Sequence, residues 1–288
     1  MRIGLTADLH YGIGHWVDRR VERFVEQTIQ PAALDVLVVA GDVAEMDSLA
    51  GAQLGVYHRE LLGTLRAAAG CPVAFCAGNH DIWCSDPQSD SWEVYRAVLG
   101  EVAAATETVY LDQENLTLGD VALVGCYGHF DFSLRTPELS IAGKRVTGDH
   151  YRRQTPPGHH QPVWMDGQKI HWPWGDAEAC AEICTGGEQR LHAALDQHRK
   201  IVFVSHGVPR MELNGHRESH DPVSRFLNAF SGTSRLEALI RQAVARGAQV
   251  LSVSGHTHKT VARRTLEGVE YLNVGGTYGE PRLVIEKI

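Results

Sequence analysis

Two histidines, His256 and His258, follow an apolar stretch near the end of the chain that reads as a buried strand. Near the start, Asp8 and His10 follow a second apolar stretch with the same spacing. On an extended chain, residues two apart face the same way and lie roughly 6–7 Å from each other. This spacing suits two ligands on one metal ion, or on two neighbouring ions about 3.5–4 Å apart.

Polar side chains also follow three other apolar stretches, namely Asp42 after residues 35–40, Asn79 and His80 after residues 72–77, and His206 after residues 201–204. In open α/β sheets, ligands collect outside the carboxyl ends of the strands. We therefore expect all of these side chains to converge on one site. Imidazole and carboxylate donors without thiolates suit manganese, iron, zinc, cobalt or nickel.

Apolar strands alternate with amphipathic helices along most of the chain, which predicts an α/β fold. Residues 35–40 are almost continuously apolar, as in a sheet that is covered on both faces. Helices are expected at residues 17–30, 47–69, 91–105, 187–198, 223–230 and 234–246. Other strands are expected as a hairpin at residues 116–118 and 121–125, and as an antiparallel flank at residues 261–266, 269–274 and 283–286.

Regular patterning stops between residues 127 and 175, although the chain as a whole, residues 1–288, reads as a single domain. Stretches of this length inside a compact domain are lids, binding loops or disorder. Here Lys and Arg outnumber Asp and Glu by six to four, and aromatic residues are frequent. We interpret residues 127–175 as an ordered, cap-like insertion beside the site.

Some side chains of this insertion have two interpretations. Arg135, Arg152 and Arg153 are candidates for binding a substrate phosphate, and solvated loop charges are the alternative. Three tryptophans could form a small core of the insertion or a platform on which a base stacks, and these are Trp164, Trp172 and Trp174.

Composition limits the classes of function. The net charge of −8 argues against broad electrostatic binding to nucleic acid or to anionic membranes. No run approaches the roughly 18 apolar residues of a membrane span, and no signal peptide is recognisable, so the protein is expected to be cytoplasmic. The six cysteines form no CxxC pair and are expected to be reduced thiols.

The order of the polar strand-end residues resembles that of the calcineurin-like metallophosphoesterase superfamily. The motifs D-x-H, G-D, G-N-H-[DE], a single H and G-H-x-H all occur here in that order, as Asp8-Leu9-His10, Gly41-Asp42, Gly78-Asn79-His80-Asp81, His206 and Gly255-His256-Thr257-His258. The resemblance runs from residue 3 to residue 258. It implies a four-layer α/β/β/α sandwich with a dinuclear metal site.

The resemblance also implies a role for each site residue. It assigns Asp8, His10 and His258 to one divalent or trivalent ion, Asn79, His206 and His256 to the other, and Asp42 as the bridge. The ions would be manganese, iron or zinc. His80 is implied as a catalytic group that faces the substrate and protonates the leaving alkoxide. Asp81 or Glu45 could accept the other N–H of His80, and the sequence does not decide between them.

Hydrolysis of a phosphoester by in-line attack of a metal-bound hydroxide is the implied activity. Serine/threonine phosphatases of the superfamily carry G-D-x-V-D-R-G, whereas residues 41–47 lack the arginine and the last glycine, so phosphoproteins are not expected. Gly41-Asp42 followed by Glu45, together with Gly78-Asn79-His80-Asp81, looks more like the bacterial branch of the superfamily. That resemblance implies a small or nucleotide-like phosphodiester or phosphomonoester as substrate.

One alternative is a DNA repair-type nuclease. Such an enzyme needs a basic groove, and only the insertion offers net positive charge. Another is a non-catalytic interaction module, although such proteins lose ligands and every ligand position is filled here.

Overall fold

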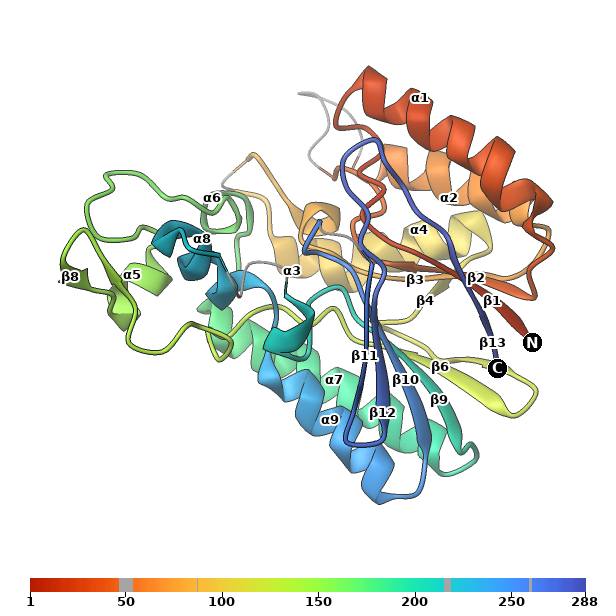
Figure 1. Cartoon of the computed structure of the whole chain (residues 1–288). Coiled ribbons are helices and arrows are strands. Elements are labelled where there is room, and N and C mark those ends of the chain that lie inside the picture. Colours follow the sequence, from red (N-terminus) through yellow and green to blue (C-terminus); the bar gives the residue numbers. More distant parts are fainter. Residues whose placement is uncertain (47–53, 87, 215–218, 259–260) are drawn as a thin grey trace.

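Two mixed β-sheets lie face to face between two layers of helices (Figure 1). The structure, a computed structural model, describes residues 1–46, 54–86, 88–214, 219–258 and 261–288. The four layers follow the order α/β/β/α, which confirms the fold class predicted from the sequence.

The first sheet contains, in spatial order, β13 (Val284–Lys287), β1 (Arg2–Thr6), β2 (Val36–Ala40), β3 (Val73–Cys76) and β4 (Val109–Tyr110). The second contains β11 (Ala262–Leu266), β12 (Val269–Asn273), β10 (Gln249–Ser254), β9 (Lys200–Val204), β6 (Val121–Gly125) and β5 (Leu116–Leu118). The central strands of each sheet run parallel, and β13, β11 and β5 are antiparallel to their neighbours. The carboxyl ends of the parallel strands therefore meet at one edge of each sheet.

Side chains of one strand alternate between two cores. In β2, Val36, Val38 and Ala40 face the core between the sheets, whereas Leu37 and Val39 face the helices. Because both faces of the strand are covered, its sequence is an unbroken apolar run rather than an alternation of apolar and polar residues.

Helices cover the outer face of each sheet. The first sheet is covered by α1 (His15–Phe24), α2 (Val56–Ala69) and α4 (Leu99–Thr106), and the second by α7 (Asp176–Leu195) and α9 (Ser234–Ala245) (Figure 1). The short α3 (Ser91–Glu93) leads into α4 through a π-helical turn, and a similar turn extends α1 to Ile29. Every helix among the described residues is too short or too polar to span a lipid bilayer.

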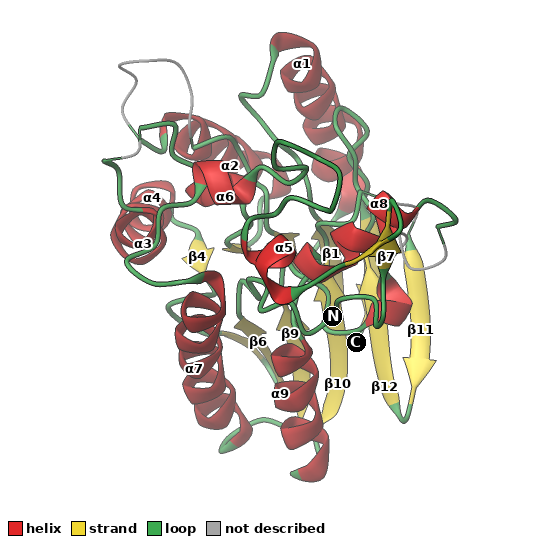
Figure 2. Cartoon of the chain, turned by 90° about the vertical axis from the view of Figure 1, so that its left-hand side faces the viewer, coloured by secondary structure: helices red, strands yellow, loops and turns green. Residues whose placement is uncertain are grey.

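The segment predicted as an insertion contains short elements, namely β7 (Ser140–Ile141), β8 (Lys144–Arg145), α5 (Gly148–Arg152) and α6 (Asp166–Lys169). They lie together with α8 (Pro222–Phe226) at one end of the molecule (Figures 1 and 2). Phe130 and Phe230 belong to a small apolar core at this end, and Trp164 packs against it. Trp172 packs instead against the large core under the helices, and Trp174 is exposed.

The prediction for the helix before β9 is wrong at its start, because α7 begins at Asp176 rather than at residue 187. The sequence pair Gly186-Gly187 resembles a helix breaker. In the fold, a Cβ atom on Gly187 would lie 2.9 Å from the Cβ of Cys126 on the neighbouring sheet layer. Close packing of the helix against the sheet therefore explains why glycine occurs inside it.

Two further predictions differ from the fold. The last three strands do not form one antiparallel flank, because β12 runs parallel to β10, and β13 joins β1 in the other sheet. Short apolar segments carry no signal for their partner strand, so the sequence did not show this. The helix predicted at residues 47–69 is observed from Val56, and residues 47–53 lie outside the described residues.

Candidate metal centre

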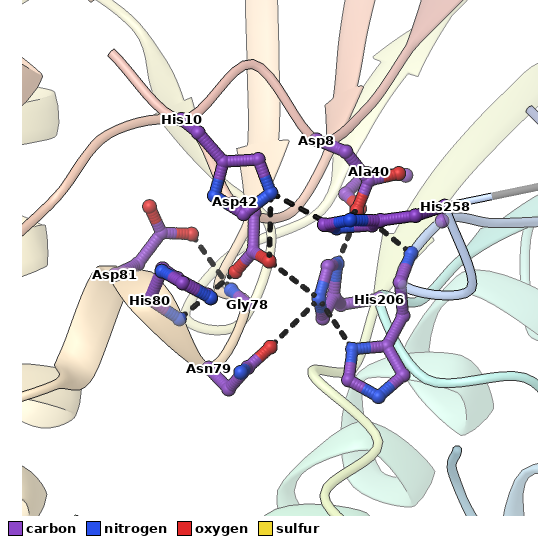
Figure 3. Close-up of polar contacts among 12 residues, drawn as sticks. Asp8, His10, Ala40, Asp42, Gly78, Asn79, His80, Asp81, His206 and His258 are labelled. Atoms are coloured by element: carbon purple, nitrogen blue, oxygen red, sulfur yellow. Dashed lines mark hydrogen bonds and ion pairs between the residues drawn. The ribbon is translucent and has the colours of Figure 1, made fainter. Parts of the chain in front are cut away.

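Loops at the carboxyl ends of five parallel strands carry the seven ligand candidates, with Asp8 and His10 after β1, Asp42 after β2, Asn79 after β3, His206 after β9, and His256 and His258 after β10. Each of these side chains has a polar atom within 3.6 Å of another member of the set. Figure 3 shows Asp42 between side chains that come from both sheets. The fold therefore brings the seven residues together.

Five of these residues adopt a left-handed backbone conformation, with φ of 55° at Asp8, 49° at His10, 50° at Asp42, 70° at His256 and 48° at His258. Such conformations cost on the order of 1–3 kcal/mol each outside glycine, and they cluster at functional sites. Here they lie in the loops that follow β1, β2 and β10, where the chain leaves each strand.

Two motif glycines are required by close contacts inside the site. A Cβ atom at Gly41, where φ is +80°, would collide with the ring of His206. A Cβ atom at Gly78 would collide with the carboxylate of Asp42. Glycine at these positions therefore lets a ligand side chain lie directly on the backbone of a neighbouring loop.

Asp8, His10, Asp42 and His258 form the first ligand group, and their ligand atoms all lie within 4.8 Å of one another. Nε2 of His10 lies 3.0 Å from Nε2 of His258 and 3.6 Å from Oδ2 of Asp42. Nδ1 of His10 lies 3.3 Å from Oε1 of Glu45. When His10 is neutral, Nδ1–H donates to this carboxylate, and the lone pair of Nε2 is directed at the group.

His206, His256, Asn79 and Asp42 form the second group. Nδ1 of His206 donates to the carbonyl oxygen of Ala40, so its Nε2 lone pair faces Oδ1 of Asn79 and Oδ2 of Asp42, each at 3.1 Å. Nε2 of His256 donates to a backbone carbonyl, so its Nδ1 lone pair faces Nε2 of His206 at 3.0 Å. With both imidazoles neutral, four acceptor atoms meet, an arrangement that suits a bound cation.

The electrostatics of the site also favour cations. Desolvation lowers the pKa of His206, but Asp42 and Asp8 outweigh it and raise the pKa to about 9. Desolvation and the neighbouring His206 lower the pKa of His256 to about 3, which keeps it neutral, as a metal ligand must be. Oδ2 of Asp8 and Oδ2 of Asp42 are buried without a hydrogen-bond donor. The donors therefore fit two metal ions.

Glu45 connects His80 to the first ligand group. Its Oε1 lies 2.8 Å from Nδ1 of His80 and accepts a hydrogen bond from it. The carboxylate of Asp81 instead accepts from Nε2 of His58 at 2.8 Å and from two backbone N–H groups. The sequence left Asp81 and Glu45 open as partners for His80. In the structure the partner is Glu45.

The imidazole of His80 is held in place on one face by Trp83, with ring centroids 3.7 Å apart. Desolvation lowers the pKa of His80, but the charge of Asp42 and the hydrogen bond to Glu45 outweigh it and raise the pKa to about 9. The surroundings therefore favour the imidazolium, which is the form that can donate a proton.

A family model described as Calcineurin-like phosphoesterase matches residues 1–260, a range that includes every residue of the two ligand groups. The chain belongs to the calcineurin-like phosphoesterase family. Among curated protein sequences, none matches it.

Three solved structures are similar to the chain at low sequence identity, and the first of them shows the same fold. A dimetal phosphatase from Danio rerio is 15% identical, with a TM-score of 0.50, and the match covers 97% of this chain and 88% of that one. The anchor in the inner membrane complex of Plasmodium is 12% identical, with a TM-score of 0.43 and coverage of 96% and 71%. A 5'-nucleotidase from Candida albicans is 16% identical, with a TM-score of 0.42 and coverage of 97% and 45%.

A cavity of about 300 Å³ lies beside the ligand groups, and it is lined by Asp42, Asn79, His80, Trp83, Val163, Trp164, Met165, His256, Thr257, His258 and Tyr278. Neither Lys nor Arg is present among these described lining residues. Away from the ligands, the walls are mainly aromatic and apolar. The sequence singled out Trp164, but Trp83, Met165 and Tyr278 were missed because no local pattern relates them to the motifs.

The three arginines that were candidates for binding phosphate do not line this cavity. Arg135 lines a separate cavity of about 620 Å³ within the insertion. Arg152 is exposed and pairs with Asp149, and Arg153 is exposed as well. None of the three arginines therefore lies at the cavity beside the ligand groups.

Proposed function

We propose that this calcineurin-like phosphoesterase hydrolyses a small phosphoester with the help of two metal ions. The observation that supports the proposal most strongly is the convergence of lone pairs in two groups that share Asp42. In this proposal Asp8, His10 and His258 would hold one ion, and Asn79, His206 and His256 would hold the other. Asp42 would serve both ions. Manganese, iron or zinc suits these donors.

His80 would act as the proton donor. When bound, the metal pair supplies Lewis-acid activation of water and neutralises charge on the phosphate. Nδ1 of His80 donates to Glu45, which leaves Nε2 as the nitrogen that delivers a proton to the leaving oxygen. The stacked ring of Trp83 restricts rotation of the imidazole beside the cavity. The chain thus contributes an oriented acid.

The volume and the lining of the cavity favour a small substrate with an uncharged organic group. Its volume of about 300 Å³ is at the lower end of the range for ligand sites. The rings of Trp83, Trp164 and Tyr278 could pack against a flat group such as a nucleobase. A DNA repair-type nuclease would need basic side chains along the phosphate backbone, and neither the lining nor the net charge of −8 favours one.

Turnover of p-nitrophenyl phosphate and bis(p-nitrophenyl) phosphate in the presence of Mn²⁺ tests the proposal. We expect Asn79→Ala and His256→Ala to abolish turnover, because each removes a donor of the second group. His160→Ala, which removes an exposed histidine of the insertion, is the matched control and should leave turnover unchanged. Near-normal turnover by Asn79→Ala or His256→Ala with two bound metal ions would contradict the assignment.

A further inference from the structure

Asp166 is a carboxylate of the insertion that is buried against the candidate metal centre, with 1% of its surface exposed. It begins the short helix α6. Its Oδ1 accepts hydrogen bonds from Nδ2 of Asn79 at 3.0 Å and from Nε1 of Trp83 at 2.7 Å. Its Oδ2 accepts from Nε1 of Trp164 at 2.8 Å. Both oxygens of the carboxylate are therefore occupied by N–H donors.

This contact determines which way the amide of Asn79 faces. Because the Asp166 carboxylate accepts hydrogen bonds, it selects the NH₂ end of the amide. The amide oxygen then points to the opposite side, where it lies 3.1 Å from Nε2 of His206. In the reverse orientation, the amide oxygen would face a carboxylate oxygen, and the NH₂ group would face the lone pairs of the second ligand group.

The same carboxylate also fixes two walls of the cavity. Trp83 stacks on His80, and Trp164 contacts His256 edge-on, with ring centroids 5.5 Å apart. Both indole N–H groups donate to Asp166. Burying a carboxylate is unfavourable, and a role in packing alone would be served by an apolar side chain. The arrangement is therefore explained by what the carboxylate orients.

We propose that Asp166 is a positioning residue, which holds the amide of Asn79 with its oxygen directed at the second metal ion. The proposal rests on the metal assignment made under the proposed function. It gives the insertion a direct part in building the metal centre, because Asp166 is contributed by residues 127–175 and Asn79 by the loop after β3. Removing the contact should weaken the second metal site and leave the first intact.

Isothermal titration of the apo protein with Mn²⁺ measures this effect without using activity. Asp166→Ala removes both acceptor oxygens, so nothing selects the NH₂ end of the Asn79 amide, and Mn²⁺ affinity at one of two sites should fall by about 10- to 100-fold. Asp149→Ala makes the same change on an exposed residue of the insertion and should bind Mn²⁺ like the wild type. Wild-type affinity at both sites of Asp166→Ala would overturn the proposal.

Exchanging the two side chains provides a test that does not depend on Asp166→Ala alone. Asn79→Asp places a carboxylate against Asp166, and the repulsion should weaken Mn²⁺ binding. In the double variant Asn79→Asp/Asp166→Asn, the amide and carboxylate are reversed and can again form a hydrogen bond. We expect the double variant to bind Mn²⁺ at least tenfold more tightly than Asn79→Asp. Equal or weaker binding by the double variant would overturn the proposal.

The wild-type titration separates this proposal from the proposed function. If the wild type binds no Mn²⁺ at the centre, the metal assignment fails and Asp166 has no metal site to position. If the wild type binds two Mn²⁺ ions but the exchange restores nothing, the assignment survives and the role of Asp166 is wrong.

Discussion

At the scale of single residues, two neighbouring carboxylates have different surroundings. Glu45 accepts from His80 and lies close to His10, whereas Asp81 accepts from His58 and from backbone N–H groups of two loops. Glu45 is therefore placed to orient the imidazoles of the site. Asp81 is placed to hold the loops that carry them.

Replacing His80 should reduce the rate without removing metal. We expect His80→Ala to retain its metal content and to lose about 10²–10⁴-fold in kcat for an alkyl leaving group, because the proton donor is missing. The loss should be much smaller for p-nitrophenolate, which departs without protonation. Equal losses across a series of leaving groups would argue against the acid role.

Amide variants of the two carboxylates should separate orientation from loop stability. Glu45→Gln should lower kcat about 10- to 100-fold with little change in stability. Asp81→Asn sets an NH₂ group against buried N–H donors and should lower the free energy of unfolding by roughly 1–3 kcal/mol. Urea unfolding and steady-state kinetics of both proteins measure the difference. If Asp81→Asn lost kcat and Glu45→Gln did not, Asp81 would be the orienting carboxylate and this assignment of the two roles would be wrong.

At the scale of elements, α7 shows how packing determines the effect of a glycine on stability. Gly186 and Gly187 are adjacent in this helix, but they face different surroundings. A Cβ on Gly186 would meet only the flexible end of Arg190, at 3.3 Å. A Cβ on Gly187 would lie 2.9 Å from the Cβ of Cys126. The same substitution should therefore have opposite effects at the two positions.

Unfolding in urea should show this contrast. We expect Gly186→Ala to raise the free energy of unfolding by about 0.5–1 kcal/mol, because alanine favours the helix. Gly187→Ala should lower it by about 1 kcal/mol or more, because overpacking outweighs the gain in helix propensity. If both variants were stabilised, the close approach of α7 to Cys126 would be wrong.

At the scale of the whole molecule, the candidate metal centre lies across the two sheets. Asp8, Asp42 and Asn79 follow strands of the first sheet, whereas His206 and His256 follow strands of the second. Metal ions bound there would connect the two sheets and bind the folded chain in preference to the unfolded one. Stability should therefore depend on metal.

Chelation should lower the unfolding temperature. Metal at about 100 times its dissociation constant stabilises the folded state by about 2.7 kcal/mol, which corresponds to roughly 4–5 °C for a chain of this size. Calorimetry of the Mn²⁺-loaded and EDTA-treated protein measures the shift. His206→Ala should show a smaller shift. An unchanged unfolding temperature in protein that had carried metal would contradict a centre shared by the sheets.

Local spacing explains why much of the site could be predicted from the sequence. Apolar runs set the strands, and the residues after each run, such as Asp42 and His206, must lie at a strand end. Because parallel strands place their carboxyl ends along one edge, residues that follow strands of one sheet converge without knowledge of the packing. Bringing His206 of the second sheet to Asp42 of the first depends on how the two sheets pack. The α/β class and the resemblance to the phosphoesterase family could also be predicted, because both depend on local runs and motifs.

Contacts between distant segments were decided only by the tertiary structure. The choice of Glu45 for His80, the burial of Asp166 against Asn79, and the glycine pair inside α7 each depend on which surfaces pack together. No periodicity in the chain encodes such a pairing. The sequence by itself determined which residues could bind metal, and the fold decided which neighbours orient them, because orientation arises from packing across the whole chain.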